Sequence, residues 1–358
     1  NNGNTISRAW DVTEKITSSF VRANIDSQMG NTSVRGNVGV QVVNTDQSSQ
    51  SNYADPSGAA HPYTDGKTYT DVLPSLNLAF GLAHQQTVRF AVAKQVARPR
   101  LDQLNAGFDF KVDQSTRLPS ASGGNAKLDP WRATALDVSY EKYFGNKAYF
   151  AAALFYKNLE NYIYNYSQTV DFSRFTPGTI AVSNFGQYSA PYNGTGGKLK
   201  GLELSASLPL DLISKSLDGF GITASATLTS SSINIQQVND TIGKIELPGL
   251  SKRVSNLTFY YEKNGFSTRI SQRRRSDYVG EIGNFAGDRQ LRYVVGDTVT
   301  DFQLGYSFET GRYKGLGILL QVNNLTNAAY ETYANSPDRQ LEYAKYGRTL
   351  LLGASYKF

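Results

Sequence analysis

The sequence predicts an all-β chain that forms part of a transmembrane antiparallel β-barrel. Three observations carry this prediction: apolar and polar residues alternate along many segments, short and long connections alternate between those segments, and the chain closes on an aromatic strand. A β-strand turns successive side chains to opposite faces, so each segment would offer one face to lipid and one to water.

The composition narrows the class of protein. The 358 residues include no Cys, which excludes a disulfide framework and a thiolate metal site. Mean hydropathy is −0.40, and no apolar run approaches the ~18 residues that a transmembrane helix needs. The net charge of +6 is that of a mixed polar surface, so we expect no nucleic-acid partner.

The last nine residues, LLLGASYKF, show the alternation most clearly. Leu350, Leu352, Tyr356 and Phe358 fall on one parity, and mostly small or polar residues fall on the other. One face therefore suits lipid and the other suits water. We interpret Tyr356 and Phe358 as the C-terminal assembly signal of the barrel.

The same pattern recurs along the chain and predicts about thirteen strands. Their polar faces use small residues, where a soluble sandwich would show more Lys and Glu. The expected strands lie near 9–26, 32–46, 67–82, 86–97, 131–145, 147–164, 197–209, 219–234, 252–263, 265–278, 298–309, 314–326 and 343–358.

The connections between these strands alternate in length. Short ones include Asn264-Gly265, a strong signal for a two-residue hairpin. Short turns on one side and long loops on the other are typical of bacterial outer-membrane barrels, with the long loops extracellular. The expected extracellular loops lie near 47–66, 98–130, 165–196, 235–251, 279–297 and 327–342.

An odd number of strands has a consequence for closure. In a thirteen-stranded meander the first and last strands run in the same direction and cannot pair antiparallel. Open edges in lipid would leave backbone groups without partners, at several kcal/mol each. The chain also starts at Asn1 without a signal peptide. We therefore expect a processed or partial chain, completed by further N-terminal strands or by a second polypeptide.

Seven segments in order resemble the C-terminal part of the barrel of TonB-dependent outer-membrane receptors. The final pair, Asn-Leu-Thr-Asn at 324–327 and Tyr-Gly-Arg at 346–348, is the most specific. The resembling segments are 68–80 (TYTDVLPSLNLAF), 88–104, 126–144, 154–163, 201–210, 322–331 (VNNLTNAAYE) and 346–358 (YGRTLLLGASYKF).

This resemblance implies a bacterial outer-membrane barrel of roughly twenty-two strands that encloses an N-terminal plug domain. About nine strands, the plug and the segment that contacts TonB would then lie outside this sequence. The implied partners are the plug or a second chain, TonB acting through the plug, outer-membrane lipid and a small nutrient. Segments 126–144 and 247–281 most resemble a proteobacterial subgroup associated with carbohydrate uptake, with siderophores or other metal chelates as the alternative.

Asp137 and Glu203 are the first candidate site residues. Both fall on the water-facing parity of their strands. The resemblance implies that two such carboxylates bind Arg residues of the plug, because carboxylate–Arg pairs can fix a position and still be broken by a pull. Solvated carboxylates without a partner are the alternative.

Arg269, Arg273 and Arg275 share one parity on a single strand. We interpret them as plug-docking residues that meet carboxylates of the plug. Contact with an anionic substrate is an alternative, and so is simple solvation in the lumen with contacts to lipid phosphates at the rim.

Aromatic residues concentrate in or beside the two longest loops and are candidates for substrate binding, since loops on a rigid scaffold commonly carry binding sites. The candidates are Phe108, Phe110, Trp131, Phe172, Phe175, Phe185, Tyr188 and Tyr192. Tyr162, Tyr164 and Tyr166 alternate near a strand end and suggest an aromatic girdle at the membrane interface, or sugar stacking.

No catalytic motif accompanies these residues. The two His residues lie apart, and the sequence has neither a Gly-x-Ser-x-Gly motif nor a phosphate-binding loop. We therefore expect a receptor rather than an enzyme, with no cofactor and no metal site. A passive porin, a two-chain barrel and a soluble β fold are the remaining alternatives.

Overall fold

The computed structural model describes residues 8–358 except 56–57, 146, 176–180, 237–241 and 286–287. In this part of the chain, twenty strands and three single-turn 3-10 helices are present. None of these helices is long and apolar enough to cross a membrane. Thirteen of the strands form one continuous antiparallel path, which is the number that the sequence predicts.

The strands of this path follow one another in the order of the sequence, and each strand between the two ends pairs with the path strand before it and the path strand after it. Its members are β1 (Trp10–Met29), β2 (Thr32–Ala54), β3 (Ala60–Leu82), β4 (Gln86–Ala97), β7 (Trp131–Phe144), β8 (Ala148–Asp171), β9 (Phe185–Pro209), β10 (Phe220–Gln236), β12 (Arg253–Lys263), β13 (Phe266–Arg275), β16 (Thr298–Ser307), β17 (Leu316–Asn323) and β20 (Thr349–Tyr356).

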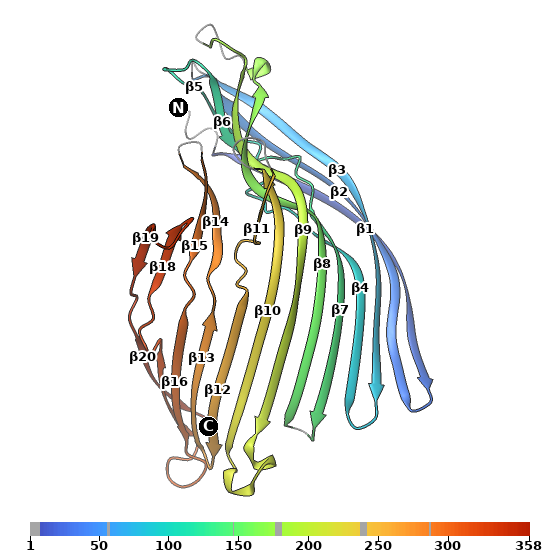
Figure 1. Cartoon of the computed structure of the whole chain (residues 1–358), viewed down its shortest axis with the longest axis vertical. Helices are drawn as coiled ribbons and strands as arrows, with labels where there is room; N and C mark the ends of the chain where they lie inside the picture. Colours follow the sequence, from blue (N-terminus) through green and yellow to red (C-terminus); the bar gives the residue numbers. More distant parts are fainter. Residues whose placement is uncertain (1–7, 56–57, 146, 176–180, 237–241, 286–287) are drawn as a thin grey trace.

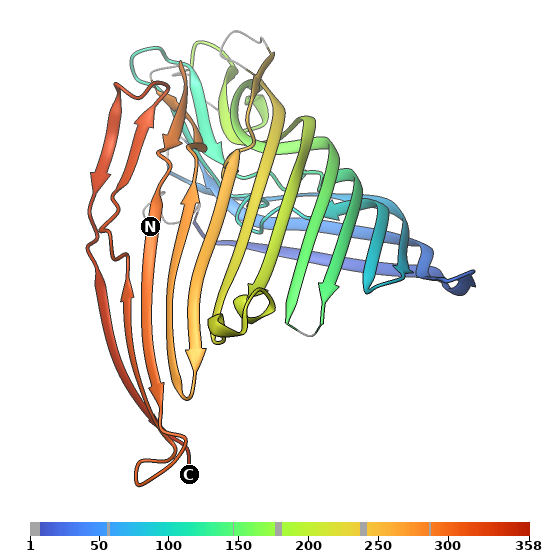
Figure 2. The ribbon, with the colours of Figure 1, turned by 60° about the horizontal axis from the view of Figure 1, so that its bottom comes forward.

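These strands form a curved, strongly twisted wall with two different ends (Figure 1). Short turns lie at the end near the C-terminus, and long hairpins project from the opposite end. Figure 2 shows how the strand direction rotates from β1 to β20. This rotation follows from the right-handed twist of individual β-strands, which turns each strand relative to its neighbour. In the described residues, β1 pairs only with β2 and β20 only with β17, so both edges of the wall are open.

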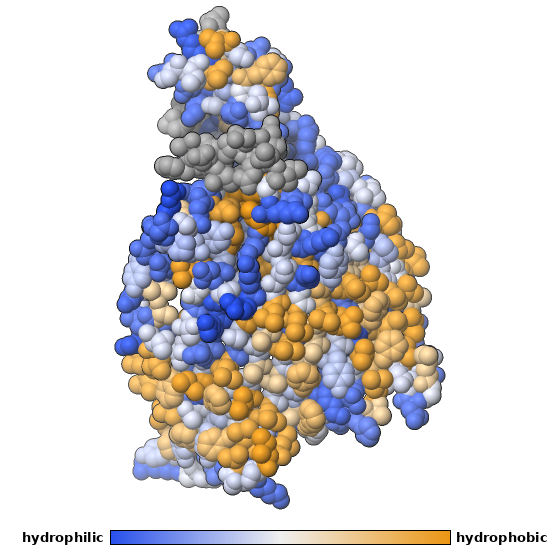
Figure 3. Space-filling model, in the orientation of Figure 1, coloured by the Kyte–Doolittle hydropathy of each residue, from blue (hydrophilic) through white to orange (hydrophobic). Residues whose placement is uncertain are grey.

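The register joins the apolar sides of the strands into one face. Directly paired residues of antiparallel strands point to the same side of a sheet. One such row joins apolar residues of six neighbouring strands: Leu350, Val322, Phe302, Ile270, Phe259 and Ile222. Leu350, Phe259 and Ile270 of this row are exposed, as a lipid-facing surface requires, and apolar residues form a band across the lower part of the molecule (Figure 3). We call this side the outward face.

The turn between β12 and β13 confirms the hairpin signal. Asn264 and Gly265 both have positive φ, at 51° and 77°. A two-residue turn with this conformation matches the twist of the flanking strands, and Asn-Gly is the sequence that adopts it most easily.

Two of the expected extracellular loops are largely strand. β2 and β3 continue as a hairpin to Ala54 and Ala60, and β8 and β9 stay paired as far as Asp171 and Phe185. The expected loops 47–66 and 165–196 are therefore much shorter than predicted. These extensions project beyond the apolar band, and one of their faces carries Tyr rather than aliphatic residues, so aliphatic alternation does not mark them.

The other expected loops contain short strands. Segment 98–130 holds a hairpin, and segments 279–297 and 327–342 supply most of a second, four-stranded sheet. These strands are β5 (Phe108–Val112), β6 (Pro119–Gly123), β11 (Ile242–Ile245), β14 (Tyr278–Phe285), β15 (Asp288–Val294), β18 (Tyr330–Ala334) and β19 (Gln340–Ala344).

Candidate functional site

The side of the wall opposite the outward face carries the two carboxylates singled out in the sequence. Asp137 of β7 pairs with Phe155 of β8, and Phe155 pairs with Gly201 of β9. Glu203 lies two residues beyond Gly201 and therefore shares this inward face. Neither carboxylate forms an ion pair with any described residue. Both remain available to a partner from outside this chain, and their role in docking a plug remains a prediction.

The three candidate arginines of β13 differ from these carboxylates, because the wall supplies partners for them. Arg269 donates to Glu262 over 3.1 Å, and Arg273 lies 4.0 Å from Asp297. Arg275 donates to the Ser251 hydroxyl and stacks over the Tyr278 ring at 3.8 Å. These contacts fix the arginines locally, and plug docking by them also remains a prediction.

Segment 98–130 packs against the inward face of β2. Gln47, only 1% exposed, donates from Nε2 to the carbonyl oxygens of Ala126 and Leu128, each at 2.8 Å. The Ser49 hydroxyl, equally buried, accepts from the Ala106 amide. Inward side chains of the strand therefore act as hydrogen-bond partners for a loop backbone that would otherwise be buried unpaired.

An ion-pair network holds the end of this segment to β3 and β7. Arg132 Nε lies 2.5 Å from Asp71 Oδ1, and the Asp71 side chain is only 5% exposed. Asp129 accepts from Lys67 over 2.7 Å and lies 3.5 Å from Arg132. The Arg132 guanidinium also lies over the Tyr69 ring. A buried carboxylate requires such a partner, so this network determines the path of the loop.

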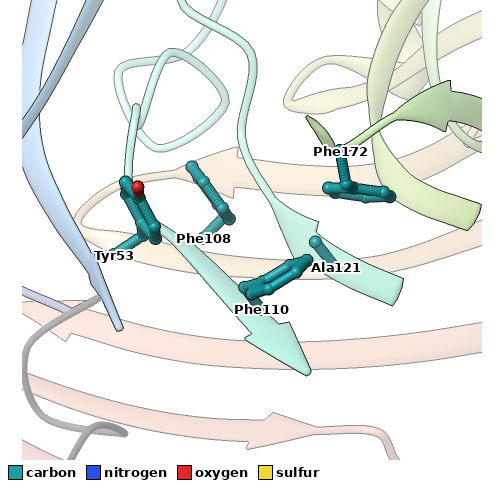
Figure 4. Close-up of a cluster of buried hydrophobic side chains, with 5 residues drawn as sticks. All are labelled: Tyr53, Phe108, Phe110, Ala121 and Phe172. Carbon is teal, nitrogen blue, oxygen red and sulfur yellow. The ribbon is translucent and has the colours of Figure 1, made fainter. Parts of the chain in front are cut away.

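Five of the eight candidate aromatic residues form one packed cluster with residues of the β2–β3 hairpin. Figure 4 shows Tyr53 beside Phe108, and Phe110 near Ala121. The Tyr53 and Phe108 rings stack at 5.1 Å, and Phe175 meets Phe108 edge-on at 4.9 Å. The five candidates in the cluster are Phe108, Phe110, Phe172, Phe175 and Tyr188.

The aromatic candidates differ in how far their rings are buried. Phe172 is 2% exposed, and Phe108 and Phe110 are also buried, so their rings stabilise the loops against one another. Phe185 is 58% exposed, and its ring is available to a ligand. Trp131 and Tyr192 are half-buried beside other side chains. A binding role for any of them remains a prediction.

The pKa values of two tyrosines in this region reflect the same packing. Burial raises the pKa of Tyr188, whose hydroxyl donates to the Gly124 carbonyl over 2.7 Å. Burial, followed by the nearby Asp65 charge, raises the pKa of Tyr63. Both phenols therefore stay neutral at physiological pH and act as hydrogen-bond donors rather than anions.

The tyrosines proposed as a membrane girdle have a different position. Tyr162 and Tyr164 are each 8% exposed and pack against Ile233 and Ile235 of β10. Buried rings cannot meet lipid head groups, so the girdle prediction is wrong for these two residues. They belong to a core that sequence alternation alone does not reveal.

Several residues of this region escaped the sequence analysis. Tyr53, Tyr63 and Arg174 lie in segments expected to be loops, but Arg174 donates to the Tyr63 hydroxyl over 2.7 Å and lies over the Phe175 ring. Ser51 pairs with Tyr63, and Tyr53 pairs with His61. Alternation of Tyr with small polar residues was the available signal for a longer hairpin.

Tyr356 and Phe358 lie at the open edge formed by β20. Their rings meet at 5.2 Å, and both side chains are exposed. The exposed rings suit recognition by an assembly factor, although that role remains a prediction.

The architecture by itself defines the class of protein. An antiparallel wall with an exposed apolar outward face, a polar inward face and long hairpins at one end is the wall of an outer-membrane barrel. The family model for TonB-dependent receptor-like β-barrels matches residues 1–325. The chain belongs to this family and is part of a bacterial outer-membrane protein.

Solved structures with the same fold include receptors and a transporter. The ferric enterobactin receptor PfeA from Pseudomonas aeruginosa has a TM-score of 0.59 and 14% identity, over 97% of this chain and 55% of its own. The siderophore receptor PiuA from Acinetobacter baumannii has a TM-score of 0.62 and 16% identity, over 98% and 44%. The ferric citrate transporter FecA has a TM-score of 0.59 and 15% identity, over 98% and 55%.

The chain therefore spans about half the length of the solved structures that it matches. Identities of 14–16% show the shared fold and do not identify a ligand. A search among curated proteins found no match.

Proposed function

We propose that the complete protein is an energy-coupled outer-membrane receptor that takes up a nutrient. Substrate would bind at the extracellular hairpins, and a pull transmitted through TonB to a plug domain would open a path along the inward face. Family membership carries this proposal. Asp137 and Glu203 support it, because they are two inward carboxylates that the described chain leaves without ion-pair partners.

We propose a carbohydrate as the nutrient, with a ferric siderophore or another metal chelate as the alternative. The carbohydrate proposal rests on the resemblance of segments 126–144 and 247–281 to a carbohydrate-uptake subgroup. The fold neighbours include receptors for ferric enterobactin and ferric citrate, and such distant relatives do not distinguish the two classes.

Uptake by a strain that carries the full-length gene tests the proposal. We expect growth on a scarce nutrient to require both the receptor and TonB. Growth on oligosaccharides as the sole carbon source, compared with growth under iron limitation on supplied siderophores, separates the two nutrient classes. Uptake that persists without TonB would contradict energy coupling.

A passive porin and a two-chain barrel make different predictions. In planar bilayers, a porin conducts continuously, whereas a plugged receptor stays closed until its plug is removed or unfolded. The intact mass of the purified protein shows whether one polypeptide supplies the plug and all the strands. A second polypeptide in the same particle would replace the single-chain proposal.

A further inference from the structure

Basic residues occupy the outward face at the point where the apolar band ends. Towards the extracellular end, the outward positions change from apolar to cationic on three strands of the path, β9, β12 and β13. The strand between β9 and β12 is β10, whose outward positions at this level are Leu228 and Ser230. In β9 the order is Leu204, Leu202, Lys200; in β12 it is Phe259, Leu257, Ser255, Arg253; in β13 it is Ile270, Gln272, Arg274.

The strand register places the three cations on a diagonal line across the wall. Lys200 pairs with Ser230 of β10, and Arg253 pairs with Leu228 of β10. Arg274 pairs with Ser255 of β12, which in turn pairs with Ala226 of β10. Barrel strands are tilted by about 40°, so residues at one membrane depth step along the sequence from strand to strand. Along β10 the level steps by two residues from one cation to the next, over two strand spacings between β9 and β12 and over one between β12 and β13, which is comparable with that tilt. A blue region lies above the apolar band in Figure 3.

A groove of about 700 Å³ lies beside these cations. Its outward lining includes Leu154, Tyr156 and Leu228, and its cations are Lys200, Lys252 and Arg253. None of its lining residues is a carboxylate. We call it the wall groove; it combines apolar walls with positive charge.

The ion-pair partners of the cations near the extracellular end of the wall show which of these cations are available. Lys94 lies 3.8 Å from Glu160, Arg132 pairs with Asp71, and Lys252 lies 2.5 Å from Glu246. By contrast, Lys200, Arg253 and Arg274 form no ion pair with any residue that the structure describes. Their side chains are exposed, so they carry uncompensated positive charge at the edge of the apolar band.

A second hollow, of about 460 Å³, lies between Arg253 and Arg274. It also contains two carboxylates, and the chain engages both of them. Asp277 accepts from the Gly296 amide over 2.8 Å, and Asp297 lies 4.0 Å from Arg273. Arg253 borders both hollows and can therefore share a ligand with Lys200 on one side and Arg274 on the other.

We propose that Lys200, Arg253 and Arg274 bind the phosphorylated head group of an anionic membrane lipid, with an acyl chain in the wall groove. The phosphate of a lipid head group would meet the three cations at the depth where the apolar surface ends. The acyl chain of the same lipid would pack against the apolar side chains of Leu154 and Leu228. A free phosphate ion would leave the apolar part of the groove unused. The site faces the membrane and is separate from the nutrient path.

Native mass spectrometry of the full-length receptor in non-ionic detergent tests this site, with dioleoylphosphatidylglycerol as the anionic probe and dioleoylphosphatidylcholine as the zwitterionic one. We expect the receptor to retain the anionic lipid preferentially. Each basic residue near an anionic lipid surface contributes about fivefold to binding. Arg253→Ala/Arg274→Ala should therefore weaken retention at least tenfold.

The matched control is Arg269→Ala/Arg273→Ala, which removes the same charge from the inward side of β13. We expect it to retain the anionic lipid normally. Equal loss in both double variants, or equal retention of the two lipids by the unaltered receptor, would overturn the proposal. Competition by inorganic phosphate alone would also overturn it, because it would identify a simple anion site.

A third variant keeps every charge and fills the groove instead. Ser230 lines the groove on the outward face, and Ser230→Trp places a large side chain there. We expect this variant to retain less anionic lipid while it reaches the outer membrane normally, because Trp is favourable at the membrane interface. Unchanged retention would contradict binding of an acyl chain in the groove.

Discussion

Asp137 and Glu203 lie on the same inward face of the wall, on β7 and β9, with Phe155 of the intervening strand level with Asp137. They lie two strand spacings, about 10 Å, apart across the sheet and two residues, about 7 Å, apart along it, so their backbones are about 12 Å apart. Neither forms an ion pair within the described chain. A single partner surface can therefore engage both carboxylates. This geometry leads to the first prediction.

Asp137→Asn/Glu203→Gln in the full-length receptor should reduce TonB-dependent uptake and weaken protection of the plug from protease. Loss of two charge-assisted hydrogen bonds costs about 1.5–3 kcal/mol for each interaction. Uptake of labelled nutrient and the rate of plug cleavage are the measurements. Thr227→Ala, at the inward position paired with Glu203, is the uncharged control. Normal uptake and protection in the double variant would remove the docking role.

Arg132→Ala should destabilise the packing of segment 98–130 by about 3 kcal/mol, because it leaves the buried Asp71 carboxylate without its cation. Hydrogen exchange of this segment measures the effect. Arg100→Ala is the matched control, since it breaks an ion pair with Asp102 whose two side chains are exposed. Similar exchange in the two variants would show that burial of the pair is unimportant.

Gln47→Ala should increase hydrogen exchange near 126–128, because two loop carbonyl groups lose their donor. The expected cost is about 1–3 kcal/mol. Gln50→Ala changes the same residue type on an exposed position of the same strand, and it should have no effect. A loop that remains protected in Gln47→Ala would mean that packing alone holds it.

Phe172→Ala and Phe185→Ala should separate loop packing from ligand binding. Phe172 is fully packed in the aromatic cluster, so its truncation should cost about 3–5 kcal/mol of local stability. Phe185 is exposed, so its truncation should leave thermal unfolding unchanged and weaken nutrient binding in an equilibrium titration. Normal affinity in Phe185→Ala would exclude this ring from the binding site.

Phe358→Ala should reduce the amount of folded receptor in the outer membrane, because the exposed C-terminal ring would be recognised during assembly. Heat-modifiable mobility on gels of membrane fractions measures folded protein. Tyr313→Ala removes an exposed ring from the turn between β16 and β17 and is the control. Equal amounts of Phe358→Ala and unaltered receptor would exclude an assembly role.

Lipid-facing strands were predictable because their signal is local. Leu350 and Leu352 fall on one parity regardless of what surrounds them, and a strand displays that parity directly. The same reasoning placed Asp137 and Glu203 on the inward face. It failed for Tyr162 and Tyr164, because burial in those positions depends on Ile233 and Ile235, about 70 residues away in the sequence.

By itself, the sequence determined thirteen strands, their outward and inward faces, an unclosed barrel and the receptor family. Only the tertiary structure decided that Phe172 is packed while Phe185 is exposed, and that Gln47 holds a loop backbone. It also decided that Arg132 is bound to Asp71, whereas Arg253 forms no ion pair with the residues that the structure describes. The physical reason is distance along the chain. Alternation acts between neighbouring residues, whereas burial and ion pairing arise between segments that only the folded wall brings together.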